Sequence, residues 1–170
     1  MLAGGIRGLC GVDGRDIVDV AADDLNHLHT TYLTAEDHGG DGALSAAAEW
    51  GPVAWCNPPY RRIMPWVLRG QLAAEHGTRS MWLVPSALDT AWGRELAASA
   101  VWWLTAGRVR FIDPNTGTEG GSPPSGHMVA LMTPATAAWR LCEVNDGTPE
   151  LELARVNFRG FIDPRTGRQL

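Results

Sequence analysis

Hydrophobic and polar positions along the first hundred residues follow two different periods. Apolar residues spaced three and four apart predict helices over residues 63–76 and 90–99, with Pro65 in the first turn of one and Thr90 as N-cap of the other. Short apolar runs typical of buried strands cover residues 16–20, 31–34, 53–56 and 79–84. This alternation of strands and helices predicts an α/β domain with a largely parallel sheet.

Three other segments of the first half carry weaker signals. Residues 21–29 fit a turn that leads into a short helix, and the alanine-rich residues 44–50 fit two helical turns. Glycines and acids in residues 36–42 predict a loop.

After residue 100 the pattern changes to strands and turns. A Pro/Gly/Ser-rich loop is predicted over residues 113–127, and extra strands are predicted over 139–170. Further strands are predicted over residues 101–104, 108–112 and 127–132. The sheet is therefore expected to end in an antiparallel part. We expect three regions, namely a glycine-rich arm (1–15), a core (16–132) and a C-terminal extension packed on that core (133–170).

Composition limits the class of protein. A chain of 170 residues with 45% hydrophobic and 19% charged residues is an ordinary globular chain of about one domain. It contains no apolar run long enough for a membrane span, and its first residues lack the apolar stretch of a signal peptide. Three widely spaced cysteines suit a reducing compartment, so a cytoplasmic protein is expected. The eight tryptophans, among them Trp55, Trp66, Trp102 and Trp103, are expected mostly in the core.

Charge narrows the chemistry further. All 14 basic residues are arginines, which excludes Schiff-base and phosphate-loop lysines. The net charge of −5 argues against a general attraction to nucleic acid. The five histidines show no metal-ligand spacing, so no metal site is predicted.

Candidate chemistry lies at the predicted ends of strands. Asp19, Asn57 and Pro85 all fall at carboxyl ends, where open α/β sheets bind their ligands. Asn57-Pro58-Pro59-Tyr60 offers an amide oxygen, a rigid backbone carbonyl and an aromatic ring. A planar base with an amino group would find two acceptors and a stacking partner there. A simple strand-ending turn is the competing interpretation, because Asn-Pro is a common turn signal.

An ordered set of short motifs makes this chain similar to a known family. The set comprises Asp-Val-Ala-Ala (19–22), Asp41-Gly-Ala-Leu, Trp55-Cys-Asn-Pro-Pro-Tyr, Trp66-Val, Leu83-Val-Pro, Thr90-Ala-Trp and Gly107-Arg-Val-Arg-Phe. It resembles the phage-type DNA N-6-adenine methyltransferases, the phage Dam-like family, over residues 16–132. The resemblance implies a Rossmann-like methyltransferase sheet and an S-adenosylmethionine-dependent enzyme of phage or prophage origin. Such an enzyme would methylate adenine N6 in double-stranded DNA and protect that DNA from restriction.

The resemblance also implies catalytic roles. Asn57 and the Pro58 carbonyl would accept hydrogen bonds from the adenine N6 amine, Pro59 would stiffen the loop, and Tyr60 would stack on the base. The two acceptors would localise the amine lone pair and direct it at the sulfonium methyl group. The target adenine would have to leave the helix, since its N6 is out of reach inside a duplex.

For the methyl donor, the resemblance implies Asp19 as partner of its ammonium group, with the small Ala21 and Ala22 allowing close approach and Asn57 also at this site. Without the resemblance, a strand-end acid such as Asp19 is more often a helix N-cap. Asp41 is similar to the acid that contacts the donor's adenine in related enzymes. Asp37 competes for that role because His-Gly-Gly is inserted between them.

Nucleic-acid contacts are predicted for a local cluster of arginines. Such a cluster would let one basic face bind DNA although the net charge of the whole chain is negative. The cluster consists of Arg61, Arg62, Arg69, Arg108 and Arg110. Ordinary solvated arginines are the alternative. The substrate also stays open among DNA adenine, cytosine N4, RNA and a protein glutamine, as does a catalytically inactive relative that binds DNA or a protein.

Overall fold

The computed structural model describes residues 17–121 and 123–142. The strands are β1 (Ile17–Asp19), β2 (Thr31–Tyr32), β3 (Val53–Cys56), β4 (Arg79–Pro85), β5 (Val101–Leu104) and β6 (His127–Met132). The helical elements are α2 (Asp37–Gly40), the 3-10 turn η1 (Gly42–Leu44), α3 (Ile63–Glu75), α4 (Ala91–Ala98) and α5 (Pro134–Cys142).

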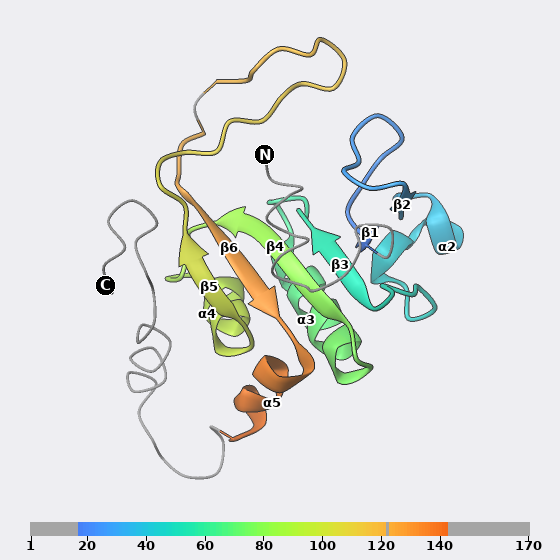
Figure 1. The fold of residues 1–170 in the computed structure, drawn as a ribbon, viewed down its shortest axis with the longest axis vertical. Helices are drawn as coiled ribbons and strands as arrows, with labels where there is room; N and C mark the ends of the chain where they lie inside the picture. The colour runs from blue at the N-terminus through green and yellow to red at the C-terminus, as the bar shows by residue number, and fades with distance from the viewer. Residues whose placement is uncertain (1–16, 122, 143–170) are drawn as a thin grey trace.

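Within the described residues, six strands form one sheet in the order β2-β1-β3-β4-β6-β5 (Figure 1). The pairs β1–β2, β1–β3 and β3–β4 are parallel, whereas β6 is antiparallel to both β4 and β5. The predicted α/β class, with a mostly parallel sheet and an antiparallel part, is confirmed. The chain runs from β1 outward to β2 and then crosses back to β3, so the strand order reverses between β1 and β3.

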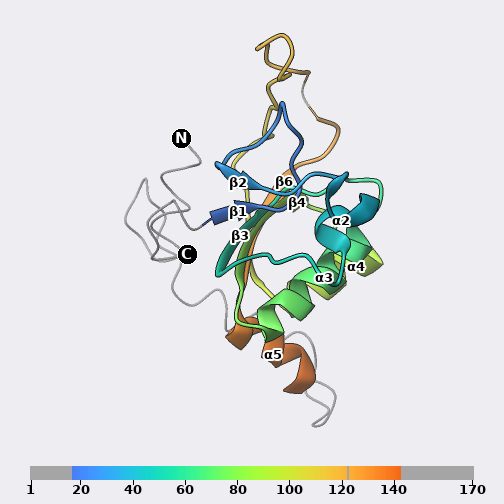
Figure 2. The same ribbon diagram turned by 90° about the vertical axis from the view of Figure 1, so that its right-hand side faces the viewer.

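Helices α3 and α4 cover one face of the sheet (Figure 2), and α5 packs against both. The core beneath α3 is built around Trp50 and Trp82, whose rings lie 6.0 Å apart. Gly70 permits this packing, because a Cβ atom there would lie 2.4 Å from the Trp82 ring. Trp55 is buried in a smaller cluster on the sheet, while Trp66 and Trp102 are partly buried against the main core.

The two strongest helix predictions are confirmed. Helix α3 carries its buried side chains, such as Ile63 and Val67, toward the sheet, and Pro65 lies in its first turn. Thr90 caps α4, because its Oγ1 accepts the Gly93 backbone N–H at 3.1 Å.

Two helix predictions in the first half are wrong. Residues 21–29 form turns, because the Asp23 carboxylate accepts the N–H groups of Leu25 and Asn26 and so competes with helical hydrogen bonds. Residues 44–50 leave the short turn η1 and become irregular, since Ser45 is already extended (φ −55°, ψ 142°). The predicted loop at 36–42 contains the single helical turn α2, interrupted by left-handed His38 and Gly39.

The second half brings two corrections. Residues 108–112 were expected as a strand but form only an isolated bridge, between Ile112 and Glu119. Residues 139–142 belong to α5 rather than to a strand, because Thr133 Oγ1 accepts the Thr136 N–H and starts a helix there. The expected arm at 1–15 and the strands expected beyond residue 142 lie outside the described residues. Within the described part, no helix is long and apolar enough to span a membrane.

Candidate active site at the carboxyl edge of the sheet

The topology brings the predicted strand ends together. β1, β3 and β4 are parallel, so Asp19, Asn57 and Pro85 all lie at one edge of the sheet (Figure 1). Because β6 runs the opposite way, its first residue, His127, lies at the same edge and pairs with Pro85. We call this the carboxyl edge.

The Asn57–Tyr60 loop leaves β3 abruptly at this edge. Two prolines cannot donate ladder hydrogen bonds, so the strand stops at Cys56. The Arg62 N–H then donates to the Pro59 carbonyl at 3.2 Å, and α3 begins at the following residue. Pro58 is buried and Pro59 is exposed, so the loop is fixed at its base and open at its tip.

Asn57 and Tyr60 contact each other directly. The Tyr60 hydroxyl donates a hydrogen bond to Asn57 Oδ1 at 3.0 Å. Partial burial raises the pKa of Tyr60 to about 12, so the hydroxyl keeps its proton at neutral pH and remains a donor. The side chain is 38% exposed, which leaves part of its ring available to a ligand.

Tyr60 belongs to an aromatic cluster that joins three distant parts of the chain. The Tyr60 ring lies 6.3 Å from Phe111 and 5.9 Å from His127, and the Phe111 and His127 rings are 5.5 Å apart in an edge-to-face arrangement. Such contacts fix ring orientation beyond simple burial. Phe111 is 38% exposed, so two partly exposed rings border the Asn57 loop.

His127 was not predicted as a site residue. It is only 2% exposed, and its Nδ1 is buried without a hydrogen-bond partner. Burial lowers its pKa, so the ring is neutral at physiological pH. A polar residue that opens an otherwise apolar strand was the one signal that the sequence offered.

Asp19 is the buried acid of the carboxyl edge. It is 3% exposed and accepts the Leu28 N–H at 2.9 Å. Burial raises its pKa, while the Leu28 and Ala21 N–H groups and the nearby His29 and His27 act in the opposite direction. Its charge also contributes to the raised pKa of the buried Cys56 thiol, after burial itself. Ala21 and Ala22 follow Asp19 directly and are half-buried.

The two acids that compete for the second donor contact differ in their surroundings. Asp37 Oδ2 accepts both the backbone N–H and the hydroxyl of Thr34, at 2.6 and 3.1 Å, and these bonds lower its pKa. Asp37 therefore holds the turn that follows β2. Asp41 is exposed between α2 and η1.

The loop after Asp19 contains a ring pair that sequence reasoning missed. His27 stacks on Tyr32 with centroids 4.2 Å apart and planes 9° apart, and the Tyr32 hydroxyl donates to Asp24. The sequence does not predict this contact, because residues 28–31 show no hydrophobic periodicity that would bring the two rings together.

The structure separates the five predicted arginines into three groups. Arg61 and Arg62 are exposed directly after Tyr60. Arg108 and Arg110 lie in the long segment after β5, where Arg108 donates to the Pro123 carbonyl and Arg110 pairs with Glu119 at 2.9 Å. Arg69 lies elsewhere.

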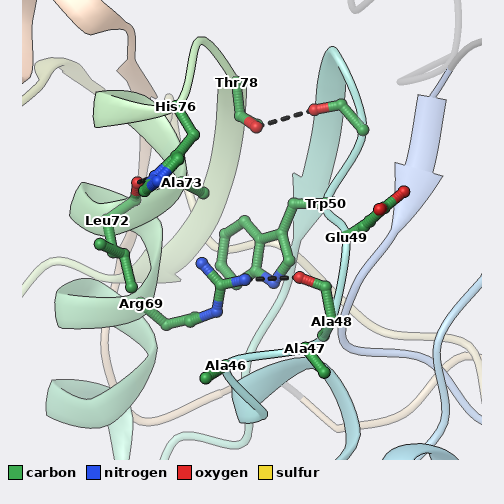
Figure 3. A pocket seen from close by; sticks show the side chains of 11 residues that line it. Ala46, Ala47, Ala48, Glu49, Trp50, Arg69, Leu72, Ala73, His76 and Thr78 are labelled. Carbon is green, nitrogen blue, oxygen red and sulfur yellow. Dashed lines mark hydrogen bonds between the residues drawn. The ribbon is translucent and has the colours of Figure 1, made fainter.

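Arg69 lines a pocket of about 480 Å³ at the opposite edge of the sheet (Figure 3). Its guanidinium donates to the carbonyls of Ser45 and Ala48 and lies 5.6 Å from the Trp50 ring centre. Other residues around the pocket are Gly51, Leu72, His76 and Thr78. Burial lowers the pKa of Arg69, and its contacts show that it holds the irregular segment after η1 against α3.

Metal ligation finds no support among residues 17–121 and 123–142, where no three His, Cys, Asp or Glu side chains are grouped as a metal site. The side chains at the carboxyl edge are instead an amide, aromatic rings and a buried acid. These groups can bind a flat base and a cationic group.

Comparison with known proteins identifies a family for this chain. Neither curated proteins nor solved structures yielded a relative of this chain. Residues 10–155, most of the chain, match the family described as DNA N-6-adenine-methyltransferase (Dam). The predicted resemblance is thereby confirmed, and the chain belongs to the DNA N-6-adenine-methyltransferase (Dam) family.

Proposed function

We propose that this protein is a DNA adenine-N6 methyltransferase that uses S-adenosylmethionine and acts on an adenine turned out of the duplex. Family membership supports the reaction class. The observation that carries the proposal is the carboxyl edge itself, where the Asn57 amide and the Tyr60 ring lie at the end of β3. The sheet would be of the Rossmann-like methyltransferase type, with its ligands at the reversal of strand order between β1 and β3.

Asn57 and Pro58 would prepare the nucleophile. The adenine amine is weakly nucleophilic because its lone pair is delocalised into the ring. Asn57 Oδ1 and the Pro58 carbonyl would accept the two N6 hydrogens and so draw them out of the base plane. The buried Pro58 and rigid Pro59 hold these acceptors in place without further reorganisation. Neither oxygen is a strong base, so the amine proton would leave to solvent after transfer.

Tyr60 and Phe111 would receive the base. Both rings are partly exposed beside Asn57, and stacking on such rings contributes about 1–3 kcal/mol per base. The N6 atom of a paired adenine cannot reach the Asn57 loop, so the base would have to turn out of the helix. The exposed Arg61 and Arg62 would contact the flanking phosphates, and Arg108 and Arg110 in the segment after β5 would add further phosphate contacts.

The residues at β1 fit the methyl donor. Bound S-adenosylmethionine would supply an electrophilic methyl group on a sulfonium. The Asp19 carboxylate is buried at the edge and accepts the Leu28 backbone N–H, and an ammonium group there would compensate its charge. Ala21 and Ala22 leave space beside it. Of the two other acids, the exposed Asp41 is freer than Asp37 to accept hydrogen bonds from the donor.

The biological role proposed is protection of phage or prophage DNA from restriction in a bacterial cytoplasm.

Two measurements test the proposed reaction. Calorimetry should detect binding of S-adenosylmethionine to the wild type and its loss in Asp19→Ala. Nucleosides from DNA treated with the protein should include N6-methyladenine. A different methylated base would remove adenine from the proposal, and absence of both binding and methylation would overturn it.

A further inference from the structure

Residues 107–121, which follow β5, form a projecting arm (Figure 1). The root of this arm lies beside the candidate site. The arm is folded on itself like a hairpin. The Gly120 N–H donates to the Phe111 carbonyl at 2.8 Å, the Asp113 N–H to the Thr118 carbonyl at 2.9 Å, and Ile112 bridges Glu119. Arg110 and Glu119 add an ion pair across the arm. The arm is therefore an ordered element and not a loose connection.

Apart from Val109, which packs against the smaller core cluster, the arm does not contribute to the core. Every residue from 110 to 121 is exposed, although the backbone pairing is well formed. A self-paired element that buries so little of its own surface is expected to contact something else.

The root of the arm is fixed to the candidate active site. The Phe111 ring contacts Tyr60 and His127, and the Thr105 N–H and hydroxyl both donate to the His127 carbonyl at 3.0 Å. A partner that contacts the root of the arm therefore lies next to the Asn57 loop. This favours the macromolecule that carries the substrate base.

Ile112 is the residue of the arm that points to a specific role. It follows Phe111 directly and is 65% exposed. The two arginines of the arm are balanced by Asp113 and Glu119, so the arm itself has no net charge and does not suit a purely phosphate-binding role. An exposed, branched apolar side chain on a hairpin suits insertion between stacked bases, as apolar wedges do in DNA-bending proteins.

We infer that the arm enters a groove of double-stranded DNA and that Ile112 occupies the space left by the extruded adenine. This inference rests on the proposed function. The Phe111 ring would contact the extruded base while Ile112 holds the gap open. The wedge offsets the cost of unpairing and unstacking, so it matters only for a target that is paired.

The test compares two duplexes of the same sequence, taken from a site that the wild type methylates. In one, the target adenine faces thymine; in the other, it faces an abasic position. Ile112→Ala should lower kcat/KM on the paired target by roughly 10- to 100-fold and leave the abasic-opposed target nearly unchanged. Ile112→Leu should retain activity on both. Leu104→Ala, at an equally exposed apolar position, is the matched control.

Equal losses of Ile112→Ala on both duplexes would overturn the inference, because they would indicate a general binding or folding role. No loss on either duplex would also overturn it, and would favour a protein partner for the arm. Absence of wild-type methylation on both duplexes would instead remove the proposed function, and this inference with it.

Discussion

The Tyr60 hydroxyl donates its hydrogen bond to Asn57 Oδ1 at 3.0 Å, so an acceptor of the Asn57–Tyr60 loop is satisfied within the loop itself. The same oxygen is the atom that would accept an N6 hydrogen of adenine. The bond orients the Asn57 amide. Because a carbonyl oxygen has two lone pairs, Oδ1 can still accept a second hydrogen bond from the substrate.

Tyr60→Phe separates the ring from the hydroxyl. The ring should still stack on adenine, while Asn57 Oδ1 loses an internal donor. We expect Kd for duplex DNA with an abasic-opposed target to stay unchanged or fall slightly. Tyr60→Ala should weaken that binding by roughly 10- to 100-fold, the value of one stacked base. Equal weakening in both variants would show that the hydroxyl, not the ring, contributes the affinity.

Asp19→Asn should make the ligand-free protein more stable at neutral pH. The folded pKa of Asp19 lies above the ordinary value of 3.8, so its proton is held more tightly in the folded than in the unfolded chain. Relative to the variant, the wild type loses stability as the pH rises from 3.8 through the folded pKa, and the difference is constant above it. Thermal unfolding of both proteins from pH 3 to 8 measures this difference. An advantage of the variant that shrinks as the pH rises would contradict it.

The same variant should bind S-adenosylmethionine poorly. An amide cannot neutralise an ammonium group, although it can still accept the Leu28 N–H. Stability gained together with donor binding lost would mark Asp19 as a residue kept for its ligand. Unchanged donor affinity would assign the ammonium to another residue.

His127 should make the fold sensitive to acid. Burial holds its folded pKa below the ordinary value of 6.5. Stability from the neutral ring is therefore complete above pH 6.5 and is lost as the pH falls through the folded pKa. His127→Phe keeps a ring beside Tyr60 and Phe111 but cannot take up a proton. The free energy of unfolding of the wild type should decline relative to this variant below pH 6.5, and parallel curves would show that His127 does not contribute.

Gly70→Ala tests the packing of α3. A methyl group there would meet the Trp82 ring at 2.4 Å, and the ring is fully buried. Overpacking costs about 1–3 kcal/mol, and a contact this short against a fully buried ring belongs to the upper part of that range, above the roughly 1 kcal/mol that alanine gains over glycine in a helix. Urea unfolding should show a net loss. Leu68→Ala on the same helix, at an exposed position, should change stability by no more than about 0.5 kcal/mol.

The sequence predicts correctly those elements whose signals lie in neighbouring residues. The periodicity of α3 and the hydroxyl cap of α4 are written in neighbouring residues, and so is the end of β3 at the proline pair. The segment after η1 was misread because its conformation depends on Arg69, more than twenty residues later, which binds its carbonyls. The start of α5 depends on a cap formed by Thr133 and Thr136. These residues lie in 133–138, between two predicted strands, where the hydrophobic pattern predicts no element.

The residues of the candidate site also divide into those close together in the sequence, which could be predicted, and those brought together only by the fold. Asn57 and Tyr60 are three residues apart, and their chemistry could be predicted from the tetrapeptide. Phe111 belongs to the Gly107-Arg-Val-Arg-Phe motif, but that motif predicts no role for its ring, and the sequence does not predict His127 as a site residue. Their contact with Tyr60 depends on β6 running antiparallel beside β4, which no short pattern reveals. Arg69 lies close to the Asn57 loop in sequence, whereas helix α3 carries it away from that loop to the opposite edge of the sheet.

The most direct test of the central claim is a nucleoside analysis of DNA incubated with S-adenosylmethionine and either the wild type or Asn57→Ala. The wild type should produce N6-methyladenine. The variant should form it at least about a hundredfold more slowly, because it lacks the oxygen that orients the amine, while it still binds the donor. An equal rate in both proteins, or no N6-methyladenine from the wild type, would contradict the account.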